Sequence, residues 1–173
     1  VTYKGPGGHS YGAFGIPNPI HALGRAIAKI ADIQVPSAPR TTFNVGRIGG
    51  GTAVNAIAAD AWMEVDLRSS DAAALRTLDK TFRQAVDDAV AQENVRWGSQ
   101  QLTVSIEIVG VRPAGRAAMN SAIVQTAISV QKSLNLPVSF AEGSTDSNYP
   151  LSLNIPSITI DTGGNASGVH TID

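Results

Sequence analysis

The sequence predicts an α+β fold, and three observations support this prediction. Two segments, at 18–33 and from residue 71 onward, repeat apolar residues at helical spacing. Four others have the composition or the alternation of β-strands. After residue 112 the pattern changes to a helix, a short apolar run and glycine loops. The chain is therefore expected to hold one α+β domain and part of a second domain.

The first predicted helix spans residues 18–33. Asn18 can cap this helix, and Pro19 suits its first position. Its large apolar residues share one face: Ile20, Leu23, Ile27 and Ile30. An apolar face of this kind must pack against another element, and we expect a sheet beneath it.

Two strands are predicted after this helix, at 40–50 and 58–70. The first ends in glycines, and the second alternates between two faces. One face carries Ala61, Met63, Val65 and Leu67, and the other carries Trp62, Glu64, Asp66 and Arg68. Because the two strands are close in sequence, they are expected to pair as a hairpin.

A second helix is predicted from Asp71 to the break at Gly98, followed by a strand over 101–109. The apolar stripe of this helix consists of Leu75, Leu78, Phe82, Val86 and Val90. With residues 1–4 as the opening strand, the element order is βαββαβ. This is the ferredoxin-like arrangement, an antiparallel sheet with two helices on one face. The domain is predicted over residues 1–114.

The remaining residues, 115–173, are predicted to be an incomplete α/β segment. Asn120 can cap a helix that runs to about Leu136, and Pro137 ends it. A short apolar strand over 155–164 then runs into a glycine loop. The chain opens like the middle of a strand, without an initiator Met or a signal-peptide pattern, and it ends three residues past a histidine. We therefore expect an excised piece of a longer protein.

The composition excludes several classes of protein. Thirteen Lys and Arg against fourteen Asp and Glu give a net charge of −1, so the chain has no basic field for nucleic acid or anionic lipid. No apolar run approaches the roughly 20 residues of a membrane span. The absence of cysteine excludes disulfides and thiolate metal sites, which leaves three histidines and the carboxylates as metal ligands. These features do not determine the compartment, although the cytoplasm is favoured.

Three regions combine glycines with polar side chains, which is how a backbone makes room for a ligand. They are "GPGGHS" at 5–10, "GGGTAVN" at 49–55, and "GSTDSN" at 143–148 with "GGNASGVH" at 163–170. In the first region, His9 can donate or accept a hydrogen bond, bind a metal, or stabilise negative charge. The alternative is a turn histidine that is exposed to water.

The segment "GGGTAVN" has two interpretations. Stacked glycine amides can hold a phosphate, but a Walker loop needs Lys and Ser or Thr after its last glycine, and here Ala53 and Val54 follow Thr52. The alternative is a plain hairpin turn. Asn55, which offers both a donor and an acceptor at the exit of the loop, makes the segment a candidate binding element.

Arg68, His21 and His170 are further candidates with simpler alternatives. Arg68 can form an ion pair with Asp66 at a sheet edge, or it can offer its forked donors to a substrate carboxylate. His21 lies off the apolar face of its helix and is expected to be solvated, with no role. His170 follows a predicted strand and a glycine loop, where α/β proteins place site residues. Nearby carboxylates are Glu142, Asp146 and Asp161. One histidine supplies only a fraction of a metal site.

Six segments together resemble, in order and spacing, one family of zinc metallopeptidases, that of the aminoacylases, carboxypeptidase G and peptidase T. The segments are "YKGPGGHSYG", "NPIHALGRAIAKI", "NVGRIGGGTAVNAIAADAWMEVDLRS", "VRPAG", "GSTDSNYPLSLNIPSITI" and "SGVHTID". The resemblance covers nearly the whole chain. It implies a two-zinc catalytic α/β domain with an inserted ferredoxin-like lid that forms the homodimer.

The resemblance also implies roles for individual residues. His9 matches the lid histidine, which reaches into the active site of the partner subunit and donates to the carbonyl oxygen as it becomes an oxyanion. Asn55 matches a lid asparagine, and Arg68 a lid arginine that holds the substrate carboxylate in some members. His170 matches the last zinc ligand. A loop lining the substrate pocket at a helix start corresponds to Gly143, Ser144 and Thr145.

The front of the family pattern has no counterpart in the chain. The first zinc ligands and the general base precede the lid in this family, and a two-metal hydrolase needs both. The resemblance therefore implies a parent enzyme that hydrolyses an amide bond in a peptide, N-acyl or N-carbamoyl amino acid. The fragment itself is expected to be inactive, to mediate dimerisation and to hold no zinc firmly. Two alternatives stay open: a non-catalytic ferredoxin-like dimerisation module, and a small-molecule-binding module that uses "GGGTAVN" as an anion loop.

Overall fold

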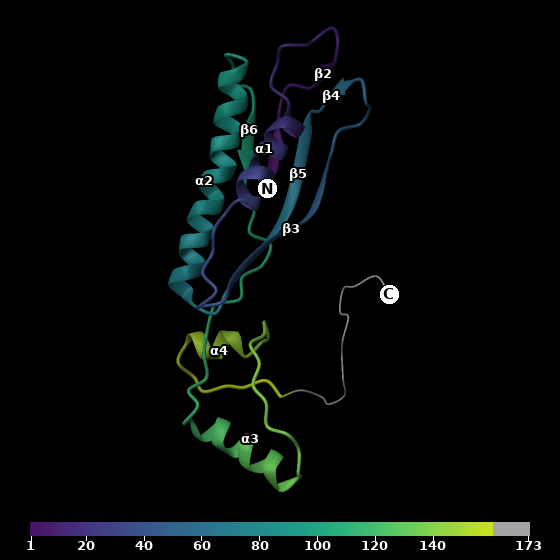
Figure 1. Ribbon diagram of the computed structural model, residues 1–173. Coiled ribbons are helices and arrows are strands. Elements are labelled where there is room, and N and C mark those ends of the chain that lie inside the picture. The colour runs from purple at the N-terminus through teal and green to yellow at the C-terminus, as the bar shows by residue number, and fades with distance from the viewer. Residues whose placement is uncertain (161–173) are drawn as a thin grey trace. The chain divides into compact units, whose positions relative to one another are not determined.

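The structure is a computed structural model that describes residues 1–160 (Figure 1). The chain divides into two compact units, Val1–Val111 and Arg112–Asp173. The first unit combines a four-stranded antiparallel sheet with two helices, which confirms the predicted α+β class. Within residues 1–160, no helix has the length and apolar character that a membrane span requires.

The first unit contains eight elements in the order strand, strand, helix, three strands of which the second is short, helix, strand. They are β1 (Thr2–Lys4), β2 (Gly8–His9), α1 (Pro19–Ala31), β3 (Thr41–Gly50), β4 (Ala56–Ile57), β5 (Asp60–Ser69), α2 (Ala72–Arg96) and β6 (Thr103–Ser105). The main sheet has the strand order β3-β5-β1-β6, and β2 pairs with β4 in a separate small sheet. The main sheet and its helices thus follow the predicted βαββαβ order, to which the small sheet is an addition.

Helix α1 begins and packs for the predicted reasons. The Asn18 side chain accepts a hydrogen bond from the Ile20 amide at 2.9 Å, and Pro19 occupies the first turn. Its buried face is formed by Ala22, Leu23, Ala26 and Ile30. The expected place of Ile20 on this face is wrong, because this residue lies in the first turn and its side chain is 43% exposed.

Helix α2 is capped by Asp71, whose carboxylate accepts from the amides of Ala73 and Ala74 at 2.9 and 2.8 Å. Leu78, Phe82 and Val86 from its predicted stripe are buried in the core between the helices and the sheet. The helix ends at Arg96, and Gly98 follows with a φ of +58°, a left-handed value that glycine adopts without strain.

Strands β3 and β5 form the predicted hairpin, with a register shift between Val45 and Arg47. One extra residue in β3 at this bulge changes which residues of the two strands lie opposite each other. Gly49 lies opposite Trp62, and a Cβ atom on Gly49 would fall 2.6 Å from the indole ring. The ring therefore covers the glycine, and the Arg47 guanidinium lies 5.5 Å from the ring centroid.

The last strand is shorter than predicted, because β6 contains only Thr103–Ser105. Its ladder is limited by β1, which contributes three residues to the pairing. Before β6, the buried Asn94 side chain takes the place of a strand partner. It donates to the Leu102 carbonyl at 2.9 Å and accepts from the Leu102 amide at 3.1 Å. Asn94 thus fixes the connection from α2 back to the sheet.

The described part of the second unit contains α3 (Ala122–Ser133) and α4 (Asn148–Ser152). The prediction that Asn120 caps α3 is wrong, since Ser121 occupies the N-cap position without a side-chain capping bond. The strand predicted over 155–164 is not formed at 155–160, because no strand in residues 112–160 is available to pair with it. The remainder of that segment lies outside the described residues.

Candidate functional site

The small sheet brings two of the predicted site residues together. His9 in β2 lies opposite Ala56 in β4, and the Ser10 amide donates to the Asn55 carbonyl at 2.9 Å. His9 and Asn55 are therefore neighbours on one end of the first unit, where Figure 1 shows β2 beside β4. The segment "GGGTAVN" connects β3 to β4 and leads into no helix, as the hairpin interpretation expects.

The glycines of "GPGGHS" allow the chain to pass close to other segments before it reaches His9. A Cβ atom on Gly5 would lie 2.9 Å from the Cδ atom of Pro19, so the backbone passes directly against the start of α1. Gly7 has a φ of +65°, which L-residues rarely adopt, and its backbone faces Ala59. We refer to residues 5–17, which run from this crossing to the start of α1, as the His9 loop.

Hydrogen bonds fix the orientation of the His9 imidazole. Its Nδ1 atom accepts from the backbone amides of Tyr11 and Gly12, both at 3.3 Å, and the Ala13 amide donates to the His9 carbonyl at 2.9 Å. Because Nδ1 accepts, the proton of the neutral imidazole belongs on Nε2. The turn after β2 therefore presents His9 as a hydrogen-bond donor on an exposed loop.

Apolar side chains are exposed on the same two loops. Tyr11 in the His9 loop is 91% exposed, and Val54 in the β3–β4 connection is fully exposed. Both residues are close in sequence to a site residue, His9 in the first case and Asn55 in the second. A donor histidine beside exposed apolar groups has the composition of a surface that a second molecule covers.

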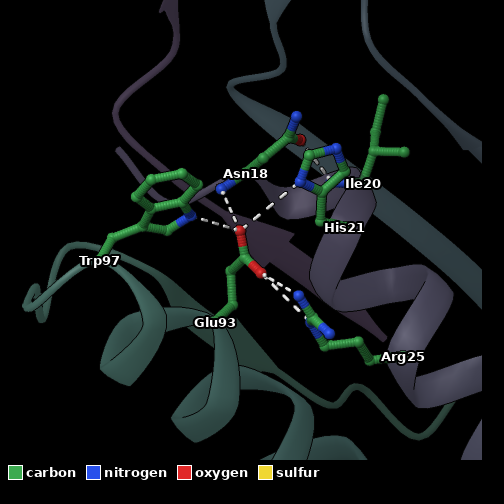
Figure 2. A network of polar contacts seen from close by, with 6 residues as sticks. All are labelled: Asn18, Ile20, His21, Arg25, Glu93 and Trp97. Carbon is green, nitrogen blue, oxygen red and sulfur yellow. Dashed lines mark hydrogen bonds and ion pairs between the residues drawn. The ribbon is translucent and has the colours of Figure 1, made fainter. Parts of the chain in front are cut away.

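A buried carboxylate joins α2 to the start of α1 (Figure 2). Glu93 has a side-chain exposure of 0%. One of its oxygens, Oε1, accepts from the Asn18 amide at 3.2 Å and from Trp97 Nε1 at 3.0 Å. The other, Oε2, accepts from Nε and Nη2 of Arg25 at 3.2 and 3.1 Å. His21, predicted to be solvated, is 58% exposed, and its Nδ1 lies 3.7 Å from Glu93 Oε1.

The role of Glu93 was not predicted from the sequence, although the sequence contains a signal for it. The residue continues the buried stripe of α2 after Val86 and Ala89, at a position where an apolar side chain is expected. A carboxylate at such a position requires several donors around it. Arg25, at the matching height of α1, was the recognisable partner.

Glu93 makes the stability of the first unit dependent on acid. Burial by itself raises the pKa of the Glu93 carboxyl, but the hydrogen bonds from Asn18, Trp97 and Arg25 outweigh burial and hold this pKa below its ordinary value. The unfolded chain therefore binds this proton more readily than the folded chain. The stabilisation is present above the ordinary pKa of 4.5 and is lost as the pH falls through the folded-state pKa.

A comparison of wild type with Glu93→Gln checks this dependence. We expect the difference between their free energies of unfolding to be largest near neutral pH and to shrink as the pH falls from about 5 toward about 3. Urea titrations at several pH values measure this difference. A difference that stays constant over the whole range would contradict the linkage.

Arg68 is separated from His9 within the chain. Its Nε atom donates to the Asp66 carboxylate two residues away, which is the ion pair that the simpler interpretation expects. The small sheet lies next to the Asp60 end of β5, and Arg68 is eight residues further along the strand, roughly 26 Å at the usual rise. The structure thus brings His9 and Asn55 together and leaves Arg68 at the other end of β5.

The predicted pocket loop, Gly143 to Thr145, lies in the second unit before α4. The Thr145 amide donates to Asn148 Oδ1 at 2.8 Å, and the Ser144 carbonyl accepts from Arg112 at 2.9 Å. The Thr145 amide is thus already hydrogen-bonded within the chain. His170, the expected zinc ligand, lies outside the described residues.

The side chains of the described residues do not supply the ligand set that zinc requires. Within residues 1–160, no group of three or more His, Asp or Glu side chains is placed to hold a metal ion. A zinc site normally uses three or four such ligands. The first unit and the described part of the second therefore do not fit a complete metal site, and the chemistry of His9 is considered without one.

Comparison with solved structures shows the same fold in larger proteins. A tripeptidase from Staphylococcus aureus has a TM-score of 0.70 and 21% identity and is matched over 90% of this chain and 40% of its own. An aminobenzoyl-glutamate utilization protein from Klebsiella pneumoniae has a TM-score of 0.71 and 18% identity, over 87% of this chain and 38% of its own. An amidase of the hydantoinase/carbamoylase family from Burkholderia vietnamiensis has a TM-score of 0.67 and 17% identity, over 90% and 36%.

The chain thus spans about two fifths of the length of these solved structures. Comparison with curated protein sequences gives no match. The family model of the peptidase dimerisation domain matches residues 1–94, which include β1 to β5, most of α2 and both neighbouring site residues, His9 and Asn55. This match confirms the resemblance found in the sequence, and the chain belongs to the peptidase dimerisation domain family.

Proposed function

We propose that the chain forms the dimerisation domain, and part of the catalytic domain, of a metal-dependent hydrolase that cleaves an amide bond. Residues 1–114 would be the dimerisation domain and residues 115–173 the catalytic portion. The substrate would be a peptide, an N-acyl amino acid or an N-carbamoyl amino acid. The family match to residues 1–94 supports the first assignment, and the likeness to a tripeptidase and an amidase over about 90% of the chain supports the second.

The observation that carries the catalytic proposal is the geometry of His9. Two amides hold Nδ1 as an acceptor, so Nε2–H is the donor that the neutral ring offers. A preorganised donor of this kind stabilises the negative charge that develops on a carbonyl oxygen during attack on an amide. Asn55, tied to Ser10 through its carbonyl, would place a side-chain amide next to the same oxygen.

The zinc ions of the proposed enzyme would be held mainly by residues outside this chain, with His170 as one ligand. When bound, they would supply the activated water that attacks the amide. Arg68 would bind a substrate carboxylate, and Gly143, Ser144 and Thr145 would line the substrate pocket. Because His9 stands on an exposed loop of a dimerisation domain, it would act in the active site of a second copy, and the working enzyme would be a homodimer.

Replacement of His9 tests the proposal in the complete protein that contains this chain. We expect His9→Ala to lower kcat by about 10²–10³-fold with little change in KM, because the donor acts on the transition state. Initial rates with acylated amino acids and short peptides measure both constants. A variant with unchanged kcat would exclude a catalytic role for His9.

Co-expression with His170→Ala tests whether His9 acts across the dimer. A mixed dimer joins an intact His9 from one copy to an intact metal site in the other, so we expect about a quarter of the wild-type activity to return. Co-expression of two differently tagged His9→Ala copies is the control and should restore none. Isolated mixed dimers without activity would exclude action across the dimer.

A non-catalytic dimerisation module is the second candidate. It is favoured by the lack of a three-ligand metal cluster within residues 1–160 and by the fact that the matched family model is itself a dimerisation domain. In that case the complete protein would dimerise without hydrolysing any amide substrate, and wild type and His9→Ala would be indistinguishable in the kinetic assay.

A further inference from the structure

The C-terminal end of α2 contacts the His9 loop at two points. The first is the hydrogen bond from the Asn18 amide, where the loop enters α1, to Glu93. The second is an edge-to-face contact between the rings of Phe14 and Trp97, with centroids 5.5 Å apart. We propose that Glu93 and Trp97 are positioning residues that hold His9 in its donor orientation. This inference rests on the proposed function of His9.

The division of partners between the two Glu93 oxygens supports this assignment. Oε2 is used by Arg25, which joins α2 to the body of α1. Oε1 is used by the Asn18 amide and by the Trp97 indole, and both of these groups lead to the His9 loop. Figure 2 shows these donors converging on the carboxylate from three sides. One oxygen thus joins the helices, and the other holds the loop.

Packing alone does not account for a carboxylate at this position. Replacing a buried ion pair with apolar residues of similar volume is often neutral or stabilising, so a fully buried Glu93 is poorly explained by stability. Directional bonds to a carboxylate fix an orientation, which an apolar contact does not. Asn18 also caps α1 through its side chain, so its backbone is held from both directions.

A short path connects these contacts to the imidazole. Phe14 follows directly after the turn in which the amides of Tyr11 and Gly12 hold His9 Nδ1. On its other side the loop is fixed by the pairing of β2 with β4. The turn is therefore held between the small sheet and the Trp97 ring. Loss of the second support would let the two amides move away from Nδ1, which would release the ring orientation.

The expected result is a loss of kcat that depends on His9. Glu93→Gln keeps the size of the side chain but removes its charge, and we expect it to lower kcat by about tenfold with KM nearly unchanged, since small displacements of a catalytic group are costly. Trp97→Phe keeps the ring contact and removes only the donor to Glu93, so its loss should be smaller. In the His9→Ala background both substitutions should have almost no further effect on kcat.

The control is Asp79→Asn, which removes an exposed carboxylate pair on α2 with Arg83, remote in sequence from Glu93. This variant should retain the wild-type kcat in both backgrounds. Equal losses from Glu93→Gln with and without His9 would overturn the inference, because a general structural defect acts in both backgrounds. Full kcat in both Glu93→Gln and Trp97→Phe would overturn it as well.

Amide hydrogen exchange tests positioning without reference to activity. The amides of Tyr11 and Gly12 should exchange several-fold faster in Glu93→Gln and in Trp97→Phe than in wild type, while the amides of β5 remain unchanged. Unchanged exchange at Tyr11 and Gly12 would overturn the inference. If exchange responds but His9→Ala retains full kcat, the positioning role stands and the proposed catalytic role of His9 fails.

Discussion

Replacing Glu93 with alanine is expected to lower the free energy of unfolding of the first unit by about 3 kcal/mol. The substitution leaves the Asn18 amide and the Trp97 indole without their acceptor in a buried region. It also leaves Arg25 unpaired, although the Arg25 side chain is 36% exposed and water can replace part of the lost interaction. The loss should therefore lie at the lower end of the range for broken buried ion pairs.

Tryptophan fluorescence during urea unfolding measures this loss selectively. Both tryptophans of the chain, Trp62 and Trp97, lie in the first unit. Asp79→Ala is the matched control, because it breaks an exposed ion pair on the same helix, and it should cost no more than about 0.5 kcal/mol. Similar losses in the two variants would show that Glu93 is not the central acceptor of the network.

Gly50→Ala is expected to destabilise the first unit by roughly 2–4 kcal/mol. Gly50 has a φ of +135°, and a Cβ atom there would lie 2.6 Å from the Cα atom of Ala61 and 2.7 Å from the Asp60 carbonyl oxygen. Both neighbours are backbone atoms of β5, so the strain cannot be relieved by a side-chain rotation. The end of the hairpin, and the β4 segment that follows it, should shift.

Gly24→Ala provides the opposite result as a control. Gly24 is an exposed position inside α1, and a Cβ atom on this residue would have open space around it, with no neighbour within 4 Å. Alanine there should raise the free energy of unfolding by about 0.5–1 kcal/mol, because it improves helix propensity without a clash. If both glycine substitutions had the same sign, steric contact at Gly50 would be excluded as the cause.

The sequence was sufficient for the elements of the main sheet and its two helices. Asn18 and Asp71 are side chains that cap helices by local hydrogen bonds, and the spacing of Leu78, Phe82 and Val86 reports directly which side of α2 is buried. These signals are local, so they can be recognised before the tertiary structure is known.

The small sheet could not be predicted in this way. Strands β2 and β4 contain two residues each, which is too short for any periodicity to appear. Their pairing joins residues 8–9 to residues 56–57, so it depends on the tertiary path of the chain. His9 and Asn55 were each recognisable as candidates, but their proximity was not.

The failed predictions share a different cause. A strand was predicted at 155–160 from its apolar residues, yet strand formation requires a partner, and residues 112–160 contain none. Ile20 was assigned to the buried face because its spacing is correct, but it lies in the first turn of α1 and remains partly exposed. In both cases the local pattern was sound and the neighbouring element was missing.

The pairing of β2 with β4 has a consequence for how this domain can change during evolution. Because main-chain hydrogen bonds join the two loops, a substitution that shifts the loop of His9 also shifts Asn55, and the reverse holds. Substitutions in the two loops should therefore show epistasis, with effects that depend on the residue already present in the other loop. Selection for a new substrate would have to alter both loops together.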